Sequence, residues 1–119
     1  QIEKNDLLMC LSSQSDNPEP LGKTAVYRYE FPALLNQRVL KMTSIKIEMV
    51  ELLYYFINSH YFHYNVSHQG GGSAQANLKL EHVLNMLIPL PPLEEQKRIV
   101  VKIEELLPYC AQLINKKYV

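Results

Sequence analysis

The sequence predicts a mixed α+β domain with a small sheet and a packed helix, followed by a long C-terminal helix with a heptad pattern. Short apolar runs bounded by turn residues fill the first 42 residues, as is typical of strands. Apolar side chains then recur every three or four residues, as in a helix packed on a core. Three prolines between residues 87 and 92 separate this part from the heptad segment. We therefore expect one domain over residues 1–86, and a connector with its helix over residues 87–119.

Three strands are expected before residue 43. The run Asp6–Leu11 follows a polar turn and predicts a buried strand, and residues 12–22 are rich in loop-forming Ser, Asn, Asp, Pro and Gly. Residues Lys23–Tyr29 have β-branched and aromatic content that favours a second strand. After Pro32, Leu34–Met42 predicts a third. Strand alternation there puts Leu35, Gln37, Val39 and Lys41 on one face, and Asn36, Arg38, Leu40 and Met42 on the other.

A helix should follow, with Ser44 as its N-cap and an end near Asn58–Ser59. Its core-facing residues at 3–4 spacing are Ile45, Met49, Leu52, Leu53 and Phe56. The stretch His60–His68 alternates aromatic and polar residues and receives no assignment. Residues 69–73 predict a flexible glycine loop, and Asn77–Met86 a short helical turn.

The last helix is expected to begin near Pro92, which suits a first helical turn, with Glu94 and Glu95 near the positive end of the helix dipole. Pro108 should kink or break it. The heptad a and d positions are Gln96, Ile99, Ile103, Leu106, Cys110, Leu113 and Lys117, and a second row is Leu93, Val100, Leu107 and Ile114. This wide apolar stripe can pack on its own domain and on a partner helix, so we expect an interface at Ile99, Ile103, Leu106, Cys110 and Leu113.

Composition narrows the class of protein. Hydrophobic residues make up 47% and charged residues 20% of 119, which is ordinary for a globular domain. No apolar run reaches the length of a membrane span, and residues 1–6 show neither the basic start nor the apolar core of a signal peptide. We therefore expect a cytoplasmic protein without membrane contact. The chain does not begin with Met, and we expect it to be part of something longer. Cys10 and Cys110 are too few for a disulfide scaffold.

The charge balance is neutral, which weakens a prediction of nucleic-acid binding without excluding it. The chain has twelve Lys and Arg residues and twelve Asp and Glu residues. The charges are uneven, however, because residues 27–46 hold four basic residues against one Glu, whereas residues 81–105 hold five Glu against three basic residues. A basic face and an acidic helix can therefore coexist.

Catalytic and metal motifs are missing from the sequence. No P-loop, cofactor-binding glycine turn or methyltransferase-type N/D-P-P-Y/F motif occurs, and Leu90–Leu93 lacks the polar and aromatic ends of the latter. His60 and His63 would lie on one helix face, but neighbouring aromatic residues favour packing and no acid or Cys completes a ligand set. We expect no enzyme activity, no cofactor and no metal.

Two segments resemble the specificity subunit of type I restriction–modification systems. Residues 72–78, Gly-Ser-Ala-Gln-Ala-Asn-Leu, match the family's G-x-A-Q-x-N segment. Residues 87–100 match its I-P-L-P-P-L-x-E-Q-x-x-I stretch, which opens the helix joining two target recognition domains. Residues 5–9 and 35–39 match more loosely. The resemblance covers nearly the whole chain, and residues 72–108 are its distinctive part.

The resemblance implies sequence-specific recognition of double-stranded DNA by part of one target recognition domain and the start of a spacer helix. It implies as partners the methyltransferase (modification) and restriction subunits, and helix pairing within the subunit or in a homodimer. Arg can read guanine, Gln and Asn can read adenine, and Lys and glycine loops suit phosphates. The candidate DNA-binding residues are Ser13, Asn36, Gln37, Arg38, Lys41, Gly71, Ser73 and Gln75.

Each candidate also has a structural interpretation. Asn36 and Gln37 can stabilise a strand end, Arg38 can be a solvated edge charge, and residues 70–77 can be a plain hinge. The alternative function is an assembly module whose helix docks subunits without reading DNA. A basic patch around Arg28, Arg38, Lys41 and Lys46 on one face would oppose that alternative.

Overall fold

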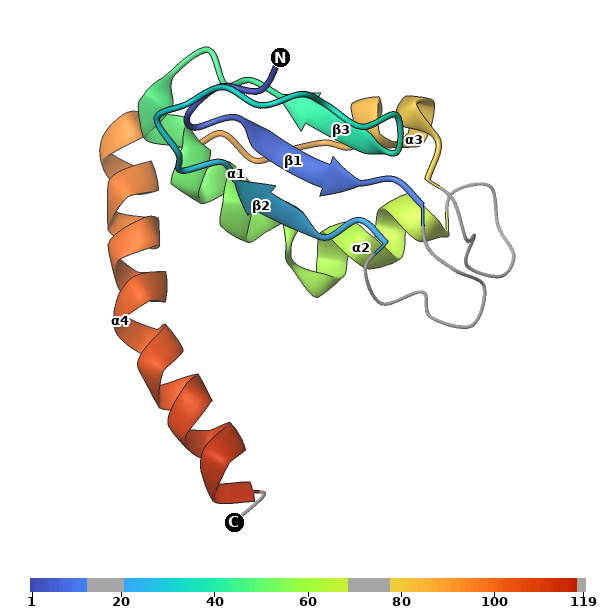
Figure 1. Cartoon of the computed structure of the whole chain (residues 1–119). Coiled ribbons are helices and arrows are strands. Elements are labelled where there is room, and N and C mark those ends of the chain that lie inside the picture. Colours follow the sequence, from blue (N-terminus) through green and yellow to red (C-terminus); the bar gives the residue numbers. More distant parts are fainter. Residues whose placement is uncertain (13–20, 69–77, 118–119) are drawn as a thin grey trace. The chain divides into compact units, whose positions relative to one another are not determined.

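The computed structural model describes residues 1–12, 21–68 and 78–117, and side chains in the last helix as far as residue 113. The chain divides into two compact units, Gln1–Pro89 and Leu90–Val119 (Figure 1). The first unit combines a three-stranded sheet with short helices, and the second contains one long helix. The predicted α+β fold class is confirmed.

The sheet of the first unit has the strand order β2-β1-β3 and is antiparallel throughout. Its strands are β1 (Leu7–Cys10), β2 (Thr24–Val26) and β3 (Val39–Met42). Leu7 and Met9 of the central strand are almost completely buried. Because side chains alternate along a strand, Leu8 and Cys10 point to the opposite face. The helices α1 (Val50–Ile57) and α2 (His60–Ser67) lie along the face that Leu7 and Met9 occupy (Figure 1).

The third strand is shorter than the prediction of Leu34–Met42, because the chain turns before it. The backbone oxygen of Asn36 accepts a hydrogen bond from Val39 N at 3.1 Å, and its side-chain Oδ1 accepts one from Arg38 N at 2.9 Å. An Asn side chain that satisfies a nearby N–H competes with ladder pairing and favours a turn. Within the strand, Leu40 and Met42 pack toward the core, as alternation predicted.

The first helix begins later than predicted, and the expected N-cap at Ser44 is wrong. A single 3-10 turn, η1 (Ile47–Met49), leads into α1 (Val50–Ile57). The Ser44 hydroxyl donates to Lys46 O at 2.7 Å and so holds a turn, while Lys46 itself is extended. Ile45 is consequently outside the helix and 99% exposed, contrary to its predicted place in the core.

The unassigned aromatic stretch forms a second helix, α2 (His60–Ser67). Ser59 caps it, because the Ser59 side chain accepts a hydrogen bond from Phe62 N at 3.2 Å. Phe62 and Val66 face inward and are almost fully buried. The predicted helical turn near residue 80 is present as α3 (Leu80–Leu84). The buried cluster comprises Leu7, Met9, Val50, Ile57, Phe62, Val66, Leu78 and Val83.

Asn58, at the C-terminal end of α1, joins this helix to the free edge of β2. Its Nδ2 donates to Thr24 O at 2.8 Å and to Tyr54 O at 3.0 Å. Its Oδ1 accepts from Thr24 N at 2.9 Å. The amide thus pairs with both backbone groups of Thr24, as a neighbouring strand would, and closes an edge that would otherwise stay open.

Asp6 ties the start of β1 to the residue that follows β3. The carboxylate is 4% exposed and accepts hydrogen bonds from Glu3 N at 2.8 Å and from the Thr43 hydroxyl at 2.7 Å. The preceding Asn5 has a φ of 71°, a left-handed conformation that Asn tolerates better than most residues. These contacts fix the two strands side by side at that end of the sheet.

The second unit is the helix α4 (Leu93–Lys117), and it continues through Pro108. The helix does not break at Pro108, so that part of the prediction is wrong. Proline removes one hydrogen bond, to the carbonyl oxygen of residue 104, and residues 104–113 are exposed enough for water to replace it. No helix in the described ranges is long and apolar enough to cross a membrane.

Candidate nucleic-acid interface

The sheet face opposite α1 and α2 is the first part of the candidate interface, and we call it the outer sheet face. Register places Leu8 between Ala25 of β2 and Lys41 of β3, and Cys10 beside Val39. Ala25 is exposed and the other four side chains are half-buried. None of the five positions carries an acidic side chain. The outer sheet face is thus largely apolar, with one cation and no acid among these five side chains.

Lysines stand at both edges of the outer sheet face. Lys41 lies on β3 and donates a hydrogen bond from Nζ to Gln1 O at 2.9 Å. Exposed Lys23 directly precedes β2, where its carbonyl oxygen accepts from Cys10 N at 3.0 Å. Since neighbouring strands lie about 4.8 Å apart, the two edges of the sheet are about 10 Å apart. The backbones that carry the two lysines are therefore separated by nearly the width of the DNA major groove, about 12 Å.

The turn before β3 supplies the remaining polar side chains. Asn36, Gln37 and Arg38 are all exposed, and Arg38 O accepts from Leu11 N at 2.9 Å, which anchors the turn to the end of β1. Asn36 uses its side chain to hold the turn, as its structural interpretation predicted. Arg38 makes no ion pair with a carboxylate among the described residues.

Two other basic residues of the first unit form ion pairs with glutamates. Arg28 forms an ion pair with Glu51 of α1, and Lys4 forms one with Glu30. The basic patch considered for Arg28, Arg38, Lys41 and Lys46 therefore lacks the contribution of Arg28. The remaining three cations make no ion pair within the described ranges. Of the other DNA-contact candidates, Ser13, Gly71, Ser73 and Gln75 lie outside the described residues.

The histidines of α2 do not assemble a metal site. Among the described residues, no group of three His, Cys, Asp or Glu side chains is placed to hold a metal ion. His60 instead stacks on Tyr64, and Tyr64 stacks on His68. His63 packs beside Gly22, where a Cβ on the glycine would lie 3.3 Å from Leu78 and 3.7 Å from the imidazole. Gly22 also has a φ of 77°, which favours glycine at this position.

Burial lowers the pKa of His63 below its ordinary value of 6.5. The charges of Lys23 and His60 act in the same direction, while the backbone at Gly22 and Ile57 acts to raise the pKa. The folded protein therefore binds a proton at His63 less readily than the unfolded chain does. Stability contributed by the neutral ring is fully present above about pH 6.5 and is lost as the pH falls from 6.5 toward the lowered value.

We expect the His63→Gln variant to lose less stability on acidification than the wild-type protein. The measurement is the urea midpoint at about pH 7.5 and about pH 5.5, on either side of the imidazole titration. The exposed His60→Gln variant is the matched control and should follow the wild type. Equal acid sensitivity of wild type and His63→Gln would contradict the role assigned to His63.

The predicted interface on α4 remains a prediction. Leu106, Cys110 and Leu113 are exposed, as an unpaired heptad face would be. Ion pairs one turn apart on the same helix, such as Arg98 with Glu95 at 3.0 Å, support its solvent-facing side. Leu8, Cys10 and Ala25 were missed as interface candidates. Strand alternation puts Leu8 and Cys10 on one face, but the run Leu7–Leu11 is apolar throughout, so the sequence does not show which face lies opposite the core.

A family model described as the type I restriction modification DNA specificity domain matches residues 1–119. No solved structure matches the chain.

Proposed function

The chain belongs to the type I restriction–modification DNA specificity domain family, and from this premise we propose that it recognises a DNA sequence without catalysing a reaction itself. The complex would be a cytoplasmic restriction–modification enzyme in which this chain forms part of the specificity subunit. The observation that carries the proposal at the level of residues is the outer sheet face, with cations at its edges and no acid among its five side chains.

Each part of the surface has its own role in this proposal. Lys41 and Lys23 contact phosphates on either side of a groove, because a lysine ammonium acts as a compact point charge. Arg38, in the exposed turn at the end of β3, reaches a guanine edge or a phosphate. Gln37 in the same turn can read an adenine edge. Asn36 contributes by holding the turn, since its side-chain oxygen already accepts from Arg38 N.

The helix α4 supplies the assembly function in the same proposal. Its exposed apolar side chains, including Leu106 and Leu113, would pair with a second long helix of the same subunit or of another copy. The methyltransferase and restriction subunits would dock on the resulting assembly. Burial of an apolar helix face is favourable at about 25 cal/mol per Å², so an exposed heptad face favours a partner.

Assembly without DNA reading is the alternative function, and the exposed face of α4 favours it. In that case α4 pairs subunits, and the outer sheet face has no nucleic-acid ligand. The neutral net charge of the chain supports the assembly function. The two functions differ in one measurable property, the affinity of the chain for duplex DNA.

The test is fluorescence anisotropy of labelled random duplex DNA with the full chain across a salt series. We expect the logarithm of the binding constant to fall linearly with the logarithm of the salt concentration, with a slope of about −0.9 for each phosphate neutralised. Two or three contacts from Lys23, Arg38 and Lys41 therefore give a logarithmic slope of about −2 to −3. Lack of binding at low salt would reject DNA reading by this chain and would favour the assembly function.

A further inference from the structure

Three rings on the outer side of α2 form a column that the fold itself does not use. His60, Tyr64 and His68 are spaced one helical turn apart, and their neighbouring ring planes are nearly parallel. The centroids of His60 and Tyr64 are 6.1 Å apart at 27°, and those of Tyr64 and His68 are 4.3 Å apart at 19°. We call these three residues the ring column.

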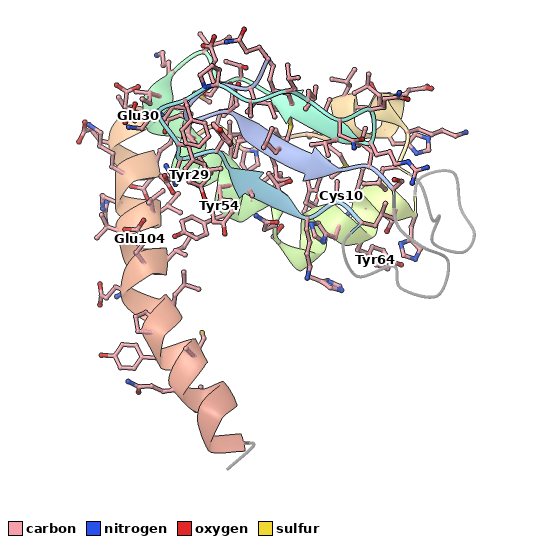
Figure 2. The ribbon with its side chains drawn as sticks, viewed as in Figure 1. Cys10, Tyr29, Glu30, Tyr54, Tyr64 and Glu104 are labelled. Carbon is pink, nitrogen blue, oxygen red and sulfur yellow. The ribbon has the colours of Figure 1, made fainter. Side chains whose placement is uncertain are left out.

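The ring column faces outward rather than into the core. Tyr64 is 55% exposed, and its side chain lies on the outer surface of α2 (Figure 2). The packing of α2 is carried by Phe62 and Val66 on the opposite side of the helix. Removing the rings of the column would therefore leave the hydrophobic core intact, and the fold gives no reason for three aligned rings at this surface.

Hydrogen bonding fixes the last ring of the column. The Nδ1 atom of His68 lies 2.9 Å from Tyr64 O, and because a carbonyl oxygen only accepts, Nδ1 carries the proton and donates. The ring plane is thereby held parallel to that of Tyr64. The His68 ring stacks closely on Tyr64, whereas the His60 ring lies farther from it. Among the described residues neither His60 nor His68 makes a further ring contact, so these two rings form the ends of the column.

The electrostatic surroundings select the kind of ligand. The sequence of α2, His60–Ser67, contains no Asp or Glu. Lys23 lies close enough to this helix for its positive charge to act on His63. A planar ligand that carries negative charge is favoured at such a surface, whereas an acidic neighbour would oppose it. Nucleobases attached to phosphates combine these two properties.

We propose that the ring column of α2 binds an unpaired nucleobase by stacking, as a second nucleic-acid contact distinct from the outer sheet face. This inference rests on the proposed function, in which the chain already lies on DNA. A base inside a duplex has both faces covered by its neighbours, so only an unpaired base can extend the column. The contact would make the chain prefer DNA with an unpaired base over the same DNA fully paired.

The test compares two duplexes of the same sequence, one fully paired and one with a single bulged fluorescent adenine analogue, in titrations with the full chain. We expect the wild-type protein to bind the bulged duplex about tenfold more tightly and to quench the analogue on stacking. His68→Ala and Tyr64→Ala should abolish both the preference and the quenching. Tyr64→Phe, which keeps the ring, should retain both.

The outcomes separate this inference from the proposed function. If the paired duplex binds with the expected salt dependence but the bulge gives neither preference nor quenching, the ring column is not a base site and the proposed function stands. Loss of binding to both duplexes in Tyr64→Ala, with an unchanged circular dichroism spectrum, would also overturn the stacking role. A wild-type chain that binds neither duplex would reject both proposals.

Discussion

Replacing Arg38 and Lys41 together by Gln lowers the affinity for random duplex DNA by about ten- to a hundredfold at physiological salt, if each cation contacts a phosphate or a base. Lys41 borders the outer sheet face, and Arg38 is exposed without a carboxylate partner in the described ranges. The salt dependence should become shallower as well, with the logarithmic slope reduced by about two. Gln keeps much of each side chain's length, so the change removes charge with little loss of volume.

The helix α4 offers a matched control for this double variant. This helix also carries one Lys and one Arg next to each other. Lys97 forms an ion pair with Glu94 at 3.4 Å, and Arg98 forms one with Glu95 at 3.0 Å. Replacing both by Gln changes the net charge by the same amount and should alter affinity much less. If the two double variants weaken binding equally, a general charge effect explains the result, and the outer sheet face is not the DNA contact.

Replacing Asn58 by Ala lowers the free energy of unfolding by about 2–4 kcal/mol, because three hydrogen bonds are lost and Thr24 is left with unpaired backbone groups. Thr24 is 7% exposed, so water cannot easily replace the lost partner. A domain of this size has a stability of about 5–15 kcal/mol, and the change is a large part of it. Urea unfolding followed by circular dichroism measures the effect.

Two further variants sharpen this prediction. Asn65→Ala removes a surface hydrogen bond from Nδ2 to Tyr61 O at 2.7 Å, and should change stability by no more than about 0.5 kcal/mol. Asn58→Asp keeps the acceptor for Thr24 N but loses both donors, so its stability should fall below that of the wild type as well. If Asn58→Ala proves no more destabilising than Asn65→Ala, the edge of β2 does not depend on this side chain.

The position of β2 against α1 also matters for function, because β2 forms one border of the outer sheet face. Ala25 is held opposite Leu8 by the register of β1 and β2, and Asn58 fixes the neighbouring Thr24 from the other side. A loss of this contact would loosen the strand edge beside Lys23. Stability of the fold and placement of the cations are therefore coupled through one amide side chain.

The local sequence predicted most of the elements, but it left the stretch that forms α2 without an assignment. The apolar run Asp6–Leu11 predicted the buried strand β1, and the heptad pattern after Pro92 predicted α4. Both signals are local, because burial requires apolar side chains at the period of the element. The family motifs at residues 72–78 and 87–100 are local too, and they sufficed to predict the family that the match over residues 1–119 shows.

Tertiary structure decided where the elements begin and which side chains meet. Ser44 was expected to cap a helix, but its bond to Lys46 holds a turn, and Ile45 ends up in solvent although its spacing suited the core. The contact of Asn58 with Thr24 spans 34 residues, and the neighbours of Leu8 come from strands on either side. Periodicity tells what a residue can bury, whereas its partners depend on chain segments far apart in sequence, and those are brought together only when the whole core packs.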